Sequence, residues 1–109
     1  MSRFKFLNFT PRAQFVELAT IEINRLLRQT PEDTQTDFRA FFDQDRFVLE
    51  AQMVSSEVKF KASVAVPIPR NHPRGREWQH PVLEELITDL ERQITKWRET
   101  CRSGVKQAA

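Results

Sequence analysis

The sequence has few of the residues on which many catalytic and structural sites depend. Cys101 is its only cysteine, which excludes an internal disulfide and any cysteine-based metal cluster and suits a reducing cytoplasm. With two glycines in 109 residues it has no glycine-rich phosphate-binding loop, and no Ser-His-Asp or Cys-His arrangement has motif spacing. These absences argue against an enzyme.

A long apolar run and a strong excess of one charge are also missing. No run approaches membrane-spanning length, and Met1 to Phe4 leads directly into alternating residues instead of the apolar core of a signal peptide. The 17 basic and 15 acidic residues nearly balance, so the net charge only weakly favours an anionic partner. We expect one cytoplasmic domain, residues 1–109, that does not contact a membrane.

Periodic segments predict the fold. Apolar and polar residues alternate at 3–6, 37–43, 47–53 and 58–66, which predicts four strands. Apolar residues recur at three- and four-residue spacing from Pro11 to Arg28 and from Pro81 to Gly104, which predicts two amphipathic helices. The three later strands form an antiparallel meander whose apolar face needs a cover. We therefore expect an α+β fold of order β-α-β-β-β-α, with two helices packed on one face of a four-stranded sheet.

Capping residues predict where the helices begin and end. Thr10 offers a hydroxyl N-cap before Pro11 at the first helical position, and Pro81 opens the second helix. Gly104 predicts the end of the second helix, with residues 104–109 as a frayed tail. The expected core stripes are Val16, Ala19, Ile23, Leu26 and Leu27 in the first helix and Leu83, Leu86, Ile87, Leu90, Ile94, Trp97 and Cys101 in the second.

Residues 67–81 form an insertion with four prolines, three arginines and both histidines, which we interpret as an exposed loop. His72 and His80 lack a carboxylate or cysteine at ligand spacing, so solvated loop histidines are favoured over metal ligands. Trp78 could pack on the core, or stack on a base or a partner side chain. Cys101 continues an apolar stripe, which favours a buried small side chain over a reactive thiol.

Charges are unevenly placed along the last helix. Acidic residues occupy its first half and basic residues follow, interrupted by Glu99; the two sets are Glu84, Glu85, Asp89 and Glu91, then Arg92, Lys96, Arg98, Arg102 and Lys106. This pattern either complements the helix dipole or forms a phosphate-binding end. Lys59 and Lys61 lie on the uncovered face of the last strand, where protection of the sheet edge is the favoured role.

Three segments resemble a known family. They are Leu86–Arg98 in the last helix, Phe9-Thr10-Pro11 before the first helix, and Glu57–Ala62 in the last strand. They are similar to the ribosome hibernation-promoting and ribosome-associated translation inhibitor family, also called the sigma-54 modulation protein family. The resemblance spans roughly residues 3–102 and implies a short form without the C-terminal extension that pairs ribosomes in long members.

The resemblance implies a fold similar to double-stranded RNA-binding domains and a non-catalytic function without cofactor, metal or small-molecule substrate. Members bind the small ribosomal subunit in the channel used by messenger and transfer RNA, and silence or store ribosomes under stress or in stationary phase. Carried over to this chain, the family's rRNA-facing positions in the last helix are Arg92, Lys96 and Arg98. Further RNA-binding candidates are Arg102, Arg25, Arg28, Arg70, Arg74 and Arg76.

Two departures from the family keep a second hypothesis open. The first helix has Glu17, Glu22 and Asn24 where the family usually carries lysines, and the long proline- and arginine-rich loop replaces a short connection. The alternative is a protein-interaction or dimerisation module that has lost RNA binding and docks a partner, or a second copy, through Trp78 and its loop. A homodimer is compatible with either hypothesis.

Overall fold

The computed structural model describes residues 4–68 and 79–108 of the chain, with 102–108 as backbone only. Its elements follow the predicted order. They are β1 (Phe4–Phe6), α1 (Ala13–Leu27), β2 (Gln35–Asp43), β3 (Arg46–Val54), β4 (Lys59–Pro67) and α2 (Gln79–Ala108). The predicted α+β fold is therefore confirmed, with β1 as the shortest of the four strands.

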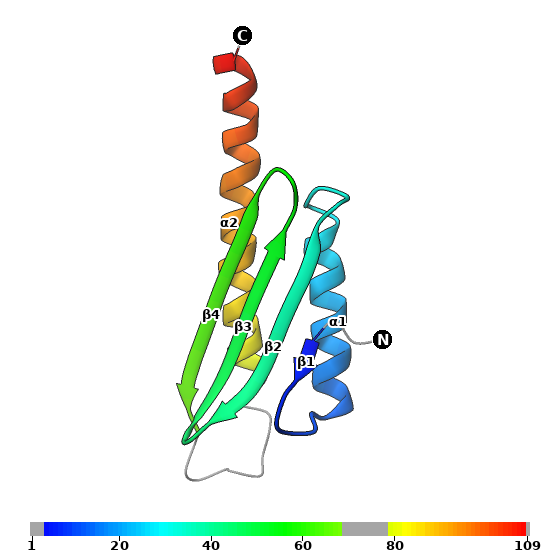
Figure 1. Ribbon diagram of the computed structural model, residues 1–109, viewed down its shortest axis with the longest axis vertical. Coiled ribbons are helices and arrows are strands. Elements are labelled where there is room, and N and C mark those ends of the chain that lie inside the picture. Colours follow the sequence, from blue (N-terminus) through cyan, green and yellow to red (C-terminus); the bar gives the residue numbers. More distant parts are fainter. Residues whose placement is uncertain (1–3, 69–78, 109) are drawn as a thin grey trace.

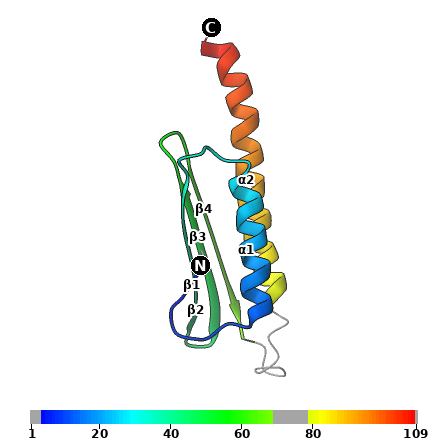
Figure 2. The same ribbon diagram turned by 90° about the vertical axis from the view of Figure 1, so that its right-hand side faces the viewer.

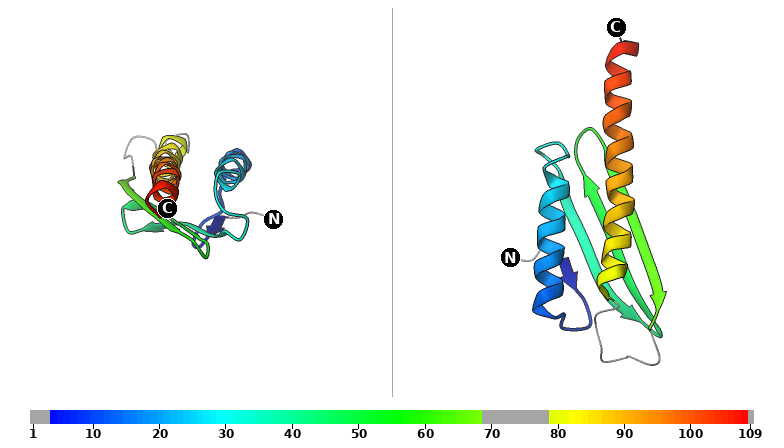
Figure 3. Two further views of the ribbon diagram at one scale, coloured as in Figure 1. Left: turned by 90° about the horizontal axis from the view of Figure 1, so that it is seen from above. Right: turned by 180° about the vertical axis from the view of Figure 1, so that it is seen from behind.

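The strands form one sheet in the order β1-β2-β3-β4, in which β1 runs parallel to β2 and the other neighbours are antiparallel. Both helices cover the same face of this sheet, as the side view and the view from above show (Figures 2 and 3). The other face has no covering element among the described residues. The result is two layers, with one edge of the sheet formed by β1 and the other by β4.

The core lies between these layers. Alternate residues of β3 point toward the helices, and all four of those predicted to do so, Phe47, Leu49, Ala51 and Met53, are buried. From α2, the predicted stripe contributes Leu83, Leu86, Ile87, Leu90 and Ile94, all buried. The apolar face of the sheet, with its period of two residues, therefore packs against the apolar stripe of α2, with its period of 3.6 residues. Burial of these side chains is the main source of stability in a domain of this size.

Phenylalanines fill the end of the core near β1. Phe15 of α1 is buried and contacts the rings of Phe4 and Phe47 edge-on, with centroid distances of 6.1 and 6.4 Å. Phe9 joins the same cluster, with its ring centroid 4.9 Å from that of Phe42. Phe15 was absent from the predicted stripe of α1, whereas the predicted Val16 is only half-buried.

The predicted start of α1 is wrong. The helix begins at Ala13, and its N-cap is Arg12, in extended conformation and without a side-chain cap bond. Asn8 explains the delay: its side chain donates to the carbonyl of Phe42 at 2.7 Å and accepts from the Phe42 N–H at 2.9 Å. The chain is therefore still tied to β2 just before Thr10, and it turns into the helix only afterwards.

Helix α2 is longer than predicted and extends past the strands at its C-terminal end (Figure 1). It begins at Gln79, two residues before Pro81, and continues through Gly104, whose cost in a helix interior is only about 1 kcal/mol. Cys101 lies on the extending part and is exposed, so its predicted burial is wrong. The apolar stripe reaches Cys101, but the sheet beneath it does not.

Candidate nucleic-acid interface

The charges of α2 are divided along its length. Between Gln79 and Leu90 the helix has three acidic residues and no lysine or arginine, whereas residues 91–108 have five basic and two acidic residues. Arg92, Lys96 and Arg98 are all exposed. Because the buried stripe fixes the helix on the sheet, these three cations sit on a rigid element, which suits them to contact a phosphate backbone.

The three cations do not share one surface. Arg92 and Lys96 are one helical turn apart and line the same shallow hollow. The other residues that line it are Thr88, Glu91, Thr95 and Glu99. Two carboxylates therefore accompany two cations there, and the positive potential of this side is lower than the sequence pattern suggests.

Arg98 lies on another side of α2, where the fold places it beside Arg28. Both line a hollow between the end of α1 and α2, together with Trp97 and Cys101. The loop residues that complete it are Gln29, Thr30 and Pro31. None of the described residues that line this hollow is acidic. We call it the arginine hollow, and it brings together two predicted RNA-binding residues that are far apart in sequence.

Trp97 gives the arginine hollow an aromatic wall. The side chain packs on the core, as predicted, edge-on against Phe60 of β4 with ring centroids 5.8 Å apart, but it is only half-buried. Its remaining surface borders the same hollow as Arg28 and Arg98. Two guanidinium groups next to a fixed aromatic side chain can bind a phosphate and an unstacked base together.

Arg25, also predicted to bind RNA, is engaged elsewhere. Its guanidinium donates hydrogen bonds to Glu22 of the same helix, at 2.8 Å, and to Glu91 of α2. These contacts raise the pKa of Arg25 above its usual value. The hydrogen bond to Glu22 has the largest effect, and the hydrogen bond to Glu91 has the second largest. With Glu84 lining the same groove, the surface between the two helices is acidic here. Phosphate binding by Arg25 would require breaking these contacts.

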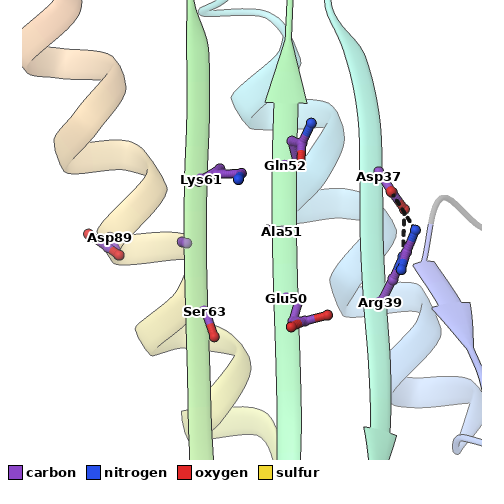
Figure 4. Close-up of a pocket in the computed structure, with 9 residues that line it drawn as sticks. Asp37, Arg39, Glu50, Ala51, Gln52, Lys61, Ser63 and Asp89 are labelled. Carbon is purple, nitrogen blue, oxygen red and sulfur yellow. Dashed lines mark hydrogen bonds and ion pairs between the residues drawn. The ribbon is translucent and has the colours of Figure 1, made fainter.

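The uncovered face of the sheet carries mixed charges (Figure 4). Asp37 and Arg39 are hydrogen-bonded side by side on β2, at 3.1 and 3.3 Å, and this contact raises the pKa of Arg39. Glu50 of β3 and Lys61 of β4 line the same open hollow. Opposite signs alternate across these strands, so this face lacks the continuous positive potential that a phosphate backbone requires.

Several predicted residues fall outside the described part of the chain. These are Arg70, Arg74, Arg76, His72 and Trp78; of Arg102, only the helical backbone is described. His80 is described, and its prediction as a solvated loop residue is wrong. It belongs to the first turn of α2 and is half-buried, with its ring centroid 6.2 Å from that of Phe15.

Residues 4–68 and 79–108 contain neither a metal-binding cluster nor a membrane-spanning helix. No group of three or more His, Cys, Asp or Glu there could hold a metal ion. Neither helix in this part of the chain is long and apolar enough to span a bilayer. The feature that sequence reasoning missed is the arginine hollow, since nothing local in the sequence relates Arg28 to Arg98.

Comparison with known proteins shows a similarity of structure and not of sequence. The sequence matches no protein-family profile, and no curated protein matches it either. Among solved structures the chain is similar to a ribosomal subunit interface protein from Coxiella burnetii, with a TM-score of 0.62 and 12% sequence identity. The match covers 88% of this chain and 94% of that chain. At this identity, the similarity is one of fold.

Proposed function

We propose that this protein binds the small ribosomal subunit without catalysis, through contacts to rRNA phosphates, and thereby silences or stores ribosomes. The observation that carries the proposal is the similarity in fold to a ribosomal subunit interface protein over nearly the full length of both chains. The resemblance of the segment Leu86–Arg98 to the ribosome hibernation family points in the same direction.

The basic surfaces of the two helices give the proposal its chemistry. The arginine hollow is the primary phosphate contact, because it has two cations, an aromatic wall and no acidic residue among those described. Arg92 and Lys96 form a second contact on another side of α2. Such contacts recognise the shape and backbone of folded RNA more than its sequence, as expected for a protein that binds structured rRNA.

Co-sedimentation with purified small subunits over a salt series tests the proposal. Binding should be stoichiometric at low salt and should weaken steeply as salt rises, because phosphate contacts release counterions. The combined Arg92→Gln, Lys96→Gln and Arg98→Gln variant should lose binding and lower the log–log salt slope by about two to three. All three side chains are exposed, so the fold should persist.

A matched control changes three charges of the opposite sign on the same helix. Glu84→Gln, Glu85→Gln and Asp89→Gln together should leave binding unchanged or strengthen it, because removal of negative charge reduces repulsion of the RNA. Undiminished binding by the triple basic variant, or no wild-type binding at low salt, would refute the proposal.

A second candidate function is favoured by a different observation. Glu22, Glu84 and Glu91 line the groove between the helices, where an RNA-binding surface would need cations. This favours the protein-interaction or dimerisation module predicted as the alternative. Trp78→Ala separates the two functions: loss of a protein complex with retained ribosome binding would support an interaction site in the loop, in addition to the ribosome site.

A further inference from the structure

The outer edge of β4 is partly occupied by a side chain that imitates a neighbouring strand. Gln93 of α2 donates from its amide to the carbonyl of Lys61 at 2.6 Å and accepts from the Lys61 N–H at 3.3 Å. These two bonds are the ones that a paired residue of an added strand would form. Asn8 does the same with Phe42 near the opposite edge. Amide side chains therefore bond to the backbone in ladder geometry at β4 and, past the end of β1, at β2.

Beyond Lys61, part of the β4 edge is open. Backbone direction alternates along a strand, so the N–H and C=O groups of Ser63 and Ala65 point away from β3, as those of Lys61 do. Within the part of the chain that the structure describes, no group is hydrogen-bonded to them on that side. Pro67 has the same orientation but lacks an N–H. The open stretch is thus bounded by Gln93 at one end and Pro67 at the other.

A groove runs beside this open stretch. Helix α2 crosses behind β4, and Asp89 lies next to the strand between the levels of Lys61 and Ser63 (Figures 1 and 4). The groove is open to solvent and has a volume of about 590 Å³. Its described lining is Ser63 and Val64 of β4 and Pro81, Glu84, Glu85, Thr88, Asp89 and Arg92 of α2.

The charge of this groove indicates which kind of ligand it would bind. Three carboxylates, on Glu84, Glu85 and Asp89, face one cation, Arg92, so the groove carries a net negative charge. Glu84 and Glu85 are exposed and free to approach a bound ligand. An RNA backbone would be repelled here, whereas lysine or arginine side chains of a peptide would be attracted.

We propose that the groove between β4 and α2 binds an extended, lysine- or arginine-containing segment of a partner protein, which adds a short strand at Ser63 and Ala65. The backbone hydrogen bonds of strand addition would supply affinity, and alternate side chains of the segment would reach the three carboxylates. The site is separate from the arginine hollow, so the proposal goes beyond ribosome binding.

The test uses a short blocked peptide of alternating lysine and valine, titrated into ¹⁵N-labelled protein and followed by amide chemical shifts. The amides of Ser63 and Ala65 should shift in a saturable manner, together with those of residues 82–92. A matched peptide of alternating glutamate and valine should cause no such shifts. If the basic peptide leaves Ser63 and Ala65 unshifted, or if both peptides bind equally well, the proposal is wrong.

Three variants sharpen the test. Ala65→Pro removes an outward N–H without breaking the ladder to β3 and should weaken peptide binding about tenfold, whereas Ala65→Ser should not. Glu84→Lys with Glu85→Lys should abolish binding, whereas Asp43→Lys with Glu57→Lys, which changes charge equally elsewhere, should not. Gln93→Ala frees the backbone N–H and C=O of Lys61, which become a third position for the added strand, and it should therefore tighten peptide binding.

Ribosome co-sedimentation of the same variants separates this proposal from the proposed function. Ala65→Pro and Ala65→Ser should bind small subunits equally, because neither changes a basic residue. Peptide binding that is insensitive to Ala65→Pro and to Glu84→Lys with Glu85→Lys would place the peptide elsewhere and overturn the inference, whatever the ribosome result.

Discussion

The first part of α2 and its C-terminal end share one helix but differ in their surroundings. Up to Ile94, the apolar stripe packs on the sheet and is buried. Beyond Trp97 the helix passes the ends of the strands, and Cys101, on the same stripe, is exposed (Figure 1). The packed part carries four of the five acidic residues of the helix, and the part beyond Trp97 carries three of the five basic ones.

Element length accounts for this difference. A helix of 30 residues is about 45 Å long, whereas a strand of nine residues spans about 30 Å. The last turns of α2 therefore have no sheet to cover. The packed part is constrained by the core, while the extending part can carry polar and charged side chains on every side. A surface for phosphate contacts fits the extending part better.

A pair of alanine substitutions tests this comparison most severely. Leu90→Ala removes a side chain with 0% exposure and should lower the free energy of unfolding by about 2–5 kcal/mol, through lost burial and a new cavity. Cys101→Ala, on the same stripe but exposed beyond the ends of the strands, should change it by less than about 0.5 kcal/mol. Urea denaturation measures both. Similar effects at the two positions would contradict the division of α2 described above.

A smaller effect should separate the two arginines near the end of α1. Arg28 lines the arginine hollow, whereas Arg25 is paired with Glu22 and Glu91. We expect Arg28→Gln to weaken small-subunit binding about five- to tenfold, and Arg25→Gln to leave it nearly unchanged while lowering stability by about 1 kcal/mol or less. Co-sedimentation and urea denaturation test this; the reverse order of binding losses would show that the Arg25 ion pairs open on the ribosome.

The smallest perturbation uses Cys101 as a reporter, without changing the protein. Its thiol is exposed at the arginine hollow, so bound small subunits should slow its labelling by a maleimide, and high salt should restore the rate. The Cys101→Ser, Glu84→Cys variant is the matched control. Its new thiol lies in the acidic part of α2 and should label at the same rate with and without ribosomes. Equal labelling of wild-type Cys101 in both states would exclude the hollow as a contact.

Local patterns predicted the elements but not the contacts between them. The alternation in β3 was enough to assign Phe47 and Met53 to the core, because each strand side faces one environment. The ion pair between Arg25 and Glu91 and the capping of Lys61 by Gln93 join elements far apart in sequence. No spacing rule relates such residues. For this reason neither the acidic groove between the helices nor the hydrogen bonding of Gln93 to the edge of β4 was predicted.

By itself, the sequence determined the order of elements, the faces that become core and the polarity of charge along α2, because these depend on residues within a few turns or strand positions of one another. Only the tertiary structure decided how far the sheet covers α2, and hence that Cys101 is exposed. It also decided that Arg28 and Arg98 line the same hollow, whereas Arg25 is paired with Glu91 outside it. These outcomes depend on the relative lengths and placement of packed elements, which arise only when the layers come together.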